Sequence, residues 1–335
     1  MALAAVCVLL VLAAPFLLVL RALLPVMPPT GMRLARLLLV CAAYQRGFAV
    51  TCLSGSLRIR LRRLPEHECL RAFDRLTALA ATRFARIAMA WARAGIAFEG
   101  PLALPDRGAP VVVLARHAGI LNTQLALSVA SVVLRRSPRG IAKRCVAIDP
   151  GLRALLRGEP LELFRWHRAG RAAALAQLAI SGAQLTNREV LCLFPEGTNL
   201  TAKRRASAIA SVRSREGGAA AYEAEAMSCV MPPHLAGALA VLRAAPTAQV
   251  LVLAHTGLED LLSWRLPEGY PPGDGSMLRM RWWSFRPGEV PREAGELARW
   301  LQTRWRAIDD WILLARSETD ERGTEPQPLR RFDAA

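Results

Sequence analysis

Residues 189–201 read EVLCLFPEGTNLT, and this stretch carries the clearest structural signal in the chain of 335 residues. Its first six residues are mostly apolar, and a short apolar run bounded by turn-forming residues is typical of a buried strand. Pro195 and Gly197 then interrupt the run abruptly, because proline and glycine favour turns. The stretch therefore predicts a buried strand that ends in a sharp turn with polar residues on it.

Similar runs occur before and after this stretch. Residues 110–115 and 249–254 are short and apolar, and residues 277–285 alternate like a strand with one face covered. Apolar residues recur near the helical period in three further segments: residues 66–98, 119–134 and 292–315. Strands that alternate with helices indicate an α/β domain, here a mixed sheet flanked by helices.

Two of the predicted strands end in residues that suit chemistry. Arg116 and His117 follow the strand at 110–115, and Asn122 comes five residues after the histidine, at the start of a helix. The other strand end is the turn at residues 195–199. Ligand sites of open α/β sheets lie at the carboxyl ends of strands, so we expect both segments to line one cleft.

These two segments resemble the lysophosphatidic acid acyltransferase family of glycerolipid acyltransferases. That family has a His-x4-Asp motif followed by a Phe-Pro-Glu-Gly-Thr motif, and residues 194–198 match the second motif in full. Two further blocks look similar, one in the middle and one near the end: Lys143-Arg144, Asp149-Pro150 and Phe164-Arg165, then Pro232-Pro233. The resemblance covers roughly residues 90–315, and we expect an acyltransferase domain at residues 64–316.

The resemblance implies that His117 is a general base, which takes the proton of a substrate hydroxyl as that hydroxyl attacks an acyl thioester. A neutral imidazole near physiological pH suits this task. The family uses its Asp to orient the His, and Asn122 stands at that position. The residues that the resemblance places at the substrate are Phe194, Pro195, Glu196, Gly197, Thr198, Asn199, Lys203, Arg204, Lys143 and Arg165. For Glu196, a turn-capping role through backbone N–H groups is the alternative.

The sequence departs from the family at two positions. Asn122 can accept a hydrogen bond from the imidazole through its amide oxygen, but it supplies no charge, and its NH2 group would hold the wrong tautomer. The same exchange in an unrelated serine protease lowers the rate about 10⁴-fold. Asn199 stands where many relatives carry a phosphate-binding Arg. Five basic residues and no acid lie between 199 and 215, so they either replace that Arg or form a solvated basic face.

The N-terminal segment predicts a membrane anchor. Residues 2–20 contain no charged residue and would form a helix of about 30 Å, long enough to span a bilayer. A cleaved signal peptide is the alternative, but no basic residue precedes the run. Residues 34–57 suit a second span or a helix at the interface.

Residues 1–63 as a whole hold eight Arg and no acid. This charge predicts that the basic region and the catalytic domain face the cytoplasm and that anionic lipids attract the region. A solvated Arg-rich linker is the other interpretation of the same residues.

The remaining composition limits the function classes. The net charge is +17, but eight of the basic residues flank the predicted anchor and no nucleic-acid-binding module appears, so we expect no nucleic acid partner. The seven cysteines are scattered without a C-x-x-C pair, which argues against a zinc site and favours reduced thiols. Nothing suggests a metal or redox cofactor. Residues 317–335 are polar and predict a flexible tail.

Two functions compete on this reading. The first is an acyltransferase that moves a fatty acyl group from acyl-CoA or acyl carrier protein to a lysophospholipid, in the simplest case 1-acylglycerol 3-phosphate. The second is a lipid-binding or scaffolding protein on the same fold, with catalysis lost through Asn122. Membrane lipids are partners in both. The acyl donor, the acceptor headgroup and the oligomeric state stay open.

Overall fold

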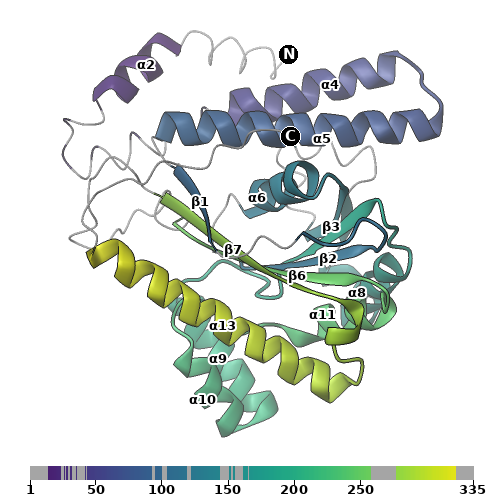
Figure 1. The fold of residues 1–335 in the computed structure, drawn as a ribbon, viewed down its shortest axis with the longest axis vertical. Helices are drawn as coiled ribbons and strands as arrows, with labels where there is room; N and C mark the ends of the chain where they lie inside the picture. The colour runs from purple at the N-terminus through teal and green to yellow at the C-terminus, as the bar shows by residue number, and fades with distance from the viewer. Residues whose placement is uncertain are drawn as a thin grey trace.

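A seven-stranded sheet forms the centre of the molecule in the computed structural model, with helices on both faces (Figure 1). The structure describes residues 14–23, 44–92, 95–99, 104–118, 122–143, 161–164, 166–257 and 277–321, with isolated positions at 26, 28, 31, 35, 42, 151 and 154. The strands, in spatial order, are β1 (Gly95–Glu99), β7 (Met277–Phe285), β6 (Gln249–Thr256), β2 (Val111–Ala115), β5 (Glu189–Leu193), β3 (Ser137–Lys143) and β4 (Leu161–Phe164). All neighbours are parallel except β6 and β7. The predicted mixed α/β sheet is confirmed.

The two central strands, β2 and β6, are buried along their whole length. Val111, Val113 and Ala115 face one hydrophobic core, whereas Val112 and Leu114 face another on the opposite side of the sheet. Because both faces are covered, these strands need apolar residues at every position, not at alternate ones. This explains why they were visible in the sequence as continuous apolar runs.

The first face is covered by the earlier helices of the chain, which are η2 (Tyr44–Ala49), α4 (Val50–Leu61), α5 (Glu66–Ala92), α6 (Asn122–Ser128) and the π-helical η3 (Val129–Val133). Helices α4 and α5 lie side by side across this face in Figure 1. Gly55 of α4 permits their close approach, since a Cβ atom there would overlap the side chain of Leu76 of α5. Phe48, Phe73 and Phe84 fill the core beneath them.

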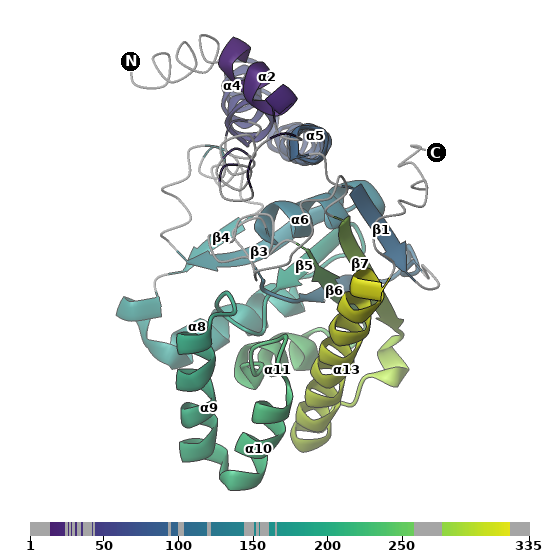
Figure 2. The same cartoon turned by 90° about the vertical axis from the view of Figure 1, so that its left-hand side faces the viewer.

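The second face is covered by α8 (Trp166–Ala183), α11 (Leu235–Ala244) and α13 (Ala294–Glu321). Leu297, Leu301, Trp305 and Ile308 of α13 are fully buried, as their helical spacing predicts. Helices α9 (Ala202–Glu216) and α10 (Gly218–Ala226) form a hairpin that projects away from the sheet on this side (Figure 2). The remaining described elements are α2 (Ala14–Leu23) and the short turn η5 (Pro287–Glu289).

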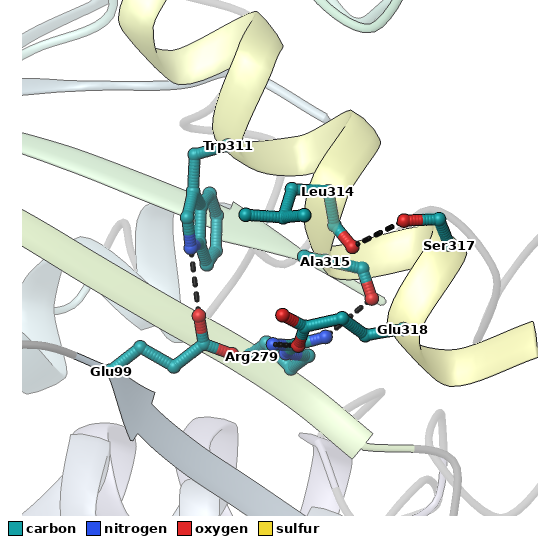
Figure 3. A network of polar contacts seen from close by, with 7 residues as sticks. All are labelled: Glu99, Arg279, Trp311, Leu314, Ala315, Ser317 and Glu318. Atoms are coloured by element: carbon teal, nitrogen blue, oxygen red, sulfur yellow. Dashed lines mark hydrogen bonds and ion pairs between the residues drawn. The ribbon is translucent and has the colours of Figure 1, made fainter. Parts of the chain in front are cut away.

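A polar network fastens the edge strand β1 to β7 and α13 (Figure 3). The guanidinium of Arg279, on β7, donates to Glu99 of β1, to Glu318 of α13 at 2.7 Å and to the backbone oxygen of Ala315. The indole N–H of Trp311 donates to the second carboxylate oxygen of Glu99 at 2.8 Å. We call these residues the edge network. It joins β1 to two elements that follow it by more than 170 residues.

Several predicted boundaries differ from the structure. The helix expected at 66–98 ends at Ala92, and residues 95–99 form β1 instead. The helix expected at 119–134 is the short α6 followed by η3. Strands β3 and β4 had not been predicted. The last helix, expected at 292–315, spans Ala294–Glu321 and so ends six residues later than predicted. Ala315 and Glu318, near its end, bond to Arg279.

The expected membrane anchor at residues 2–20 lies largely outside the described residues, which begin with α2 at Ala14. Among the helices of the described ranges, none is both long enough and apolar enough to cross a bilayer. The segment 34–57, interpreted as a second span or a helix at the interface, corresponds in its described part to η2 and α4. Thr51 and Cys52 of α4 are buried. Residues 322–335 of the expected tail are also outside the described part.

Candidate active site

His117 and Asn122 contact each other at the carboxyl edge of the sheet, the edge where β2, β3, β5 and β6 end. His117 follows β2 directly, and Asn122 is the first residue of α6. The amide nitrogen Nδ2 of Asn122 lies 2.8 Å from Nδ1 of His117. The two residues are five positions apart in the sequence, and their side chains are in contact.

The direction of this hydrogen bond decides which imidazole tautomer is present. In the structure the amide N–H donates to Nδ1, which leaves the ring proton on Nε2. Asn122 is 2 % exposed, and its Oδ1 has no hydrogen-bond partner in the described part of the protein. If the side-chain amide of Asn122 is rotated by 180°, Oδ1 accepts a hydrogen bond from Nδ1–H, and the NH2 group then occupies the position without a partner. Each orientation makes one bond, so each tautomer of His117 can be held.

The matched turn lies next to this pair. The rings of Phe194 and His117 pack edge to face, with centroids 5.0 Å apart and an interplanar angle of 61°. This contact follows from the sheet order, because β2 and β5 are adjacent parallel strands and end side by side. The two segments that carry the family motifs are thus in direct contact.

Gly197 gives the turn its shape. Its φ of +65° lies in the left-handed region, which strains any residue with a Cβ atom. A Cβ atom at this position would also lie 3.1 Å from Cδ2 of His234. The backbone N–H of His234 donates to Pro195 at 2.8 Å, which holds the segment 231–234 against the turn. Gly197 is exposed and Thr198 and Asn199 are half-buried, so this part of the turn is accessible to a ligand.

Glu196, which the resemblance places at the substrate, is fully buried. Its Oε1 accepts from the backbone N–H of His117 at 3.1 Å, and its Oε2 accepts from that of Met231 at 3.2 Å. A carboxyl without exposed surface does not face a substrate, and the turn-capping alternative describes its contacts better. Burial raises the pKa of Glu196 to about 7, although the positive charge of Arg116, the two backbone N–H groups and the indole of Trp305 act in the opposite direction.

Arg116 is fully buried under the site as well. Its Nη1 donates to the backbone oxygen of His255 at 2.6 Å, and its Nη2 donates to that of Cys229 at 2.6 Å. Nε2 of His255 lies 3.2 Å from the backbone oxygen of Arg116, so His255 is a core histidine with a backbone partner. We call Arg116, Glu196 and the backbone groups that they bond the site network.

The basic residues after the turn fall into two groups. Lys203 and Arg204 are exposed in the first turn of α9, whose cap is Thr201. Arg205 and Arg213 bond instead to α10 and the residues after it: Arg205 to the backbone oxygens of Glu225 and Met227, and Arg213 to the carboxylate of Glu225. Arg215, in the last turn of α9, bonds to the backbone oxygen of Ser211. Of these five basic residues, Lys203 and Arg204 lie nearest to the turn along the chain.

The other predicted substrate residues are less informative. Lys143 is the last residue of β3, so its backbone reaches the same carboxyl edge of the sheet. Arg165 lies outside the described residues. Asn199 places its Oδ1 in a buried position where the described residues offer no hydrogen-bond partner. In those parts of the chain that the structure describes, no cluster of three or more His, Cys, Asp or Glu is arranged to hold a metal ion.

Comparison with known proteins identifies the fold. No protein-family model and no curated protein sequence matches the chain. Among solved structures, the crystal structure of the 1-acyl-sn-glycerophosphate (LPA) acyltransferase PlsC from Thermotoga maritima matches with a TM-score of 0.56 and 17% identity. The match covers 84% of this chain and 98% of that one. The chain has a glycerolipid acyltransferase fold. The fold that the sequence motifs implied is thereby confirmed.

On this acyltransferase fold, Arg116 lies at the strand end where the sequence analysis placed it, and the segment 229–231 adjoins the block at Pro232-Pro233. Their contacts with Glu196 and with each other were not predicted. Nothing in the sequence indicates that Cys229 and Met231 contribute backbone groups to the site network, because this depends on how separate loops meet in space.

Proposed function

We propose that this protein is an acyltransferase that transfers a fatty acyl group from an acyl thioester to the hydroxyl of a lysophospholipid. The simplest acceptor is 1-acylglycerol 3-phosphate, which would place the enzyme in phospholipid synthesis. The observation that carries the proposal is the contact of His117 with Asn122 and with Phe194, at the carboxyl edge of a sheet with the glycerolipid acyltransferase fold. The pair supplies a base, and the adjacent turn supplies a place for the acceptor.

In the proposed reaction, Nε2 of His117 takes the proton of the acceptor hydroxyl while the hydroxyl oxygen attacks the carbonyl carbon of the thioester. The C–S bond then breaks, and the imidazolium returns its proton to the leaving thiolate. Nε2 must be unprotonated at the start, so the active tautomer is the one in which Asn122 accepts from Nδ1–H through its oxygen. Asn122 cannot offset the charge of the imidazolium, and we expect a slower enzyme than one with Asp.

The acceptor phosphate fits the exposed end of the turn. Lys203 and Arg204, in the first turn of α9, follow Asn199 by four and five residues and provide the positive charge that Asn199 lacks. The acyl donor is acyl-CoA or acyl carrier protein, which both present a thioester as substrate. No cofactor enters this reaction, since the thioester carries the activated acyl group.

We also propose that the protein works at a membrane, with the catalytic domain on the cytoplasmic side. The end of α4 supports contact with lipid, because exposed Leu57 and Leu61 alternate with arginines there: Arg58, Arg60, Arg62 and Arg63. Apolar side chains next to basic ones suit an anionic lipid surface. The uncharged run at residues 2–20 supports the same location.

The alternative function is a lipid-binding protein without catalysis. It is favoured by one observation, the amide N–H of Asn122 that donates to Nδ1 of His117. In that state the ring proton sits on Nε2, and the imidazole cannot take a proton from an acceptor hydroxyl.

An acyl-transfer assay separates the two functions. Labelled acyl-CoA or acyl carrier protein and lysophosphatidic acid would be presented to the protein in vesicles. His117→Ala should abolish transfer, and His67→Ala is the matched control, because His67 is exposed on α5. Transfer by wild type and by the His67 variant, but not by the His117 variant, supports the acyltransferase. Binding of the lysophospholipid with no transfer by wild type, even with both donors, supports the lipid-binding protein.

A further inference from the structure

The turn at 195–197 and the loop that begins at Cys229 are joined to His117 through one buried carboxyl. Oε1 of Glu196 bonds to the N–H of His117 itself, and Oε2 bonds to the N–H of Met231. The backbone of His117 therefore has a fixed relation to two other segments at the carboxyl edge. On the basis of the acyltransferase function above, we propose that Glu196 is a positioning residue for His117 and that Arg116 keeps Glu196 in the carboxylate form.

The two bonds of Glu196 are strongest in the carboxylate form, because an ionised carboxyl is a better acceptor than a neutral one at both oxygens. Protonation places a hydrogen on one oxygen, and the bond that this oxygen accepts becomes weaker. The backbone of His117 or that of Met231 is then held less firmly. A neutral Glu196 should thus loosen the placement of the base relative to the turn where the acceptor is proposed to bind.

Arg116 favours the carboxylate form and ties in the third segment. Its charge lowers the pKa of Glu196 against the effect of burial. Its two donated bonds, to the backbone oxygens of Cys229 and His255, hold the loop after α10 and the end of β6. Arg116 and Glu196 follow the neighbouring strands β2 and β5, and both are fully buried.

Other charged or titratable groups surround this pair in the described residues. His117 and His255 lie at the ends of β2 and β6, and His234 packs on Gly197. From α13, Asp309 bonds to the N–H groups of Ser228 and Cys229, and Arg316 reaches Thr256 and the sulfur of Cys229. Among these, Arg116 is the cation that acts on the carboxyl of Glu196 with the largest effect.

The first experiment is the pH profile of kcat for acyl transfer. The proposal requires Glu196 to be ionised for full kcat. Loss of the Arg116 charge should raise the pKa of Glu196 and so move the acidic limb of the kcat profile to higher pH. We expect Arg116→Met to shift that limb by about one pH unit or more. Glu196→Gln should lower kcat about 10²-fold with little change in KM, because the base is misplaced and the side chain does not touch substrate. In Glu196→Gln, the added Arg116→Met change should no longer move the limb.

Asp309→Asn is the matched control. Asp309 is a buried carboxylate that bonds to the backbone of the same loop, but it has no bond to His117. A merely structural role for Glu196 predicts that both variants lose stability and that both keep the wild-type pH profile. The proposal predicts that Asp309→Asn keeps the profile and kcat per folded molecule. Equal kcat losses in the two variants, or an unmoved limb in Arg116→Met, would overturn it.

A second measurement does not depend on turnover. In protein labelled with ¹⁵N-histidine, the backbone amide signal of His117, assigned through His117→Gln, should titrate as Glu196 ionises. The titration should be absent in Glu196→Gln and shifted upward in Arg116→Met. If the amide titrates but no transfer is detected, the proposed function fails and the positioning of His117 stands. If transfer occurs and the amide does not titrate, Glu196 is not the positioning residue.

Discussion

Each of the two networks contains a central arginine, Arg116 in the site network and Arg279 in the edge network, but the charge of the two arginines is balanced differently. Arg279, in the edge network, bonds to the carboxylates of Glu99 and Glu318 and keeps part of its side chain exposed. Arg116, in the site network, is fully buried and bonds to two backbone oxygens, and its charge acts on one carboxyl, that of Glu196. Two carboxylates stabilise the charged form of Arg279, so its pKa is raised.

This difference separates stability from function. In the edge network, the charge of Arg279 is neutralised by Glu99 and Glu318, and these bonds hold β1 and α13 together. In the site network, burial raises the pKa of the Glu196 carboxyl to about 7, which is close to neutral pH. A group that titrates at the pH of the reaction is suited to a catalytic site and poorly suited to a structural joint. We therefore expect changes in the site network to alter rate and pH dependence, and changes in the edge network to alter unfolding.

The largest effect should come from Asn122→Asp. Aspartate accepts from Nδ1–H in either orientation, fixes the reactive tautomer of His117 and offsets the imidazolium charge. By analogy with the serine protease exchange, kcat should rise about 10²- to 10⁴-fold, up to roughly 5 kcal/mol at the transition state. The measurement is acyl transfer beside Arg279→Met, which should turn over at the wild-type rate per folded molecule. A variant with unchanged kcat would show that Asn122 already orients the ring fully.

Glu196→Gln should change how stability depends on pH. The pKa of Glu196 rises from 4.5 in the unfolded chain to about 7 in the fold, so the folded protein holds a proton that the unfolded chain has lost in this window. Stability therefore falls as pH rises from about 4.5 to about 7, by about 3 kcal/mol in total. Denaturant unfolding at several pH values should show this loss in wild type and not in the variant. Parallel pH dependences of the two proteins would contradict the buried titration.

Arg279→Met should destabilise the edge network without affecting chemistry. The change leaves Glu99 and Glu318 without their cation, and since these groups are partly exposed we expect a loss of about 2 kcal/mol, below the value for a fully buried pair. Unfolding in denaturant measures the effect, and acyl transfer at low denaturant provides the control. A drop in kcat per folded molecule would mean that the edge of the sheet contributes to the site after all.

Gly197→Ala should produce a smaller effect at the turn. The left-handed backbone strains alanine, and the new methyl group presses against the ring of His234. We expect a loss of stability of about 1–2 kcal/mol and a higher KM for the acceptor. Gly217→Ala, at another positive φ with open space around it, is the matched control for backbone strain alone. A raised KM in both variants would exclude a local effect on the proposed acceptor site.

Asn199→Arg should have the smallest effect. An Arg at this position adds a fork of N–H donors next to the turn and should lower KM for a phosphate-bearing acceptor about tenfold, with no gain for an acceptor that lacks phosphate. Kinetics with lysophosphatidic acid and with a monoacylglycerol distinguish the two. Equal gains for both acceptors would indicate that residue 199 does not lie near the phosphate.

The sequence allowed the central strands and the histidine pair to be predicted, because both depend on local signals. Strands β2, β5 and β6 were visible since two covered faces require continuous apolar residues. By contrast, β3 has the sequence SPRGIAK, which lacks such a run, and is held in the sheet by pairing with β5 and by the ion pair of Arg139 with Glu189. Edge strand β1 follows a long helix closely and was read as its continuation.

The site network could not be predicted in the same way. The contact of His117 with Asn122 spans five residues, and the resemblance to the His-x4-Asp motif implied it. Oε2 of Glu196 instead meets the N–H of Met231 across 35 residues, and Nη1 of Arg116 meets the oxygen of His255 across 139. Such contacts are set by sheet order and loop packing, which a single sequence does not reveal.

The position of β1 also has a consequence for synthesis on the ribosome. Gly95 pairs with Met277, so the partner strand of β1 is 182 residues away along the chain. At about 5–20 residues per second, roughly 10–40 s pass before β7 can leave the ribosome and join β1. During that time the growing chain has no edge network, and a strand that awaits a late partner is open to wrong pairing. We therefore expect the pairing of β1 with β7 to be a slow or chaperone-assisted step of folding.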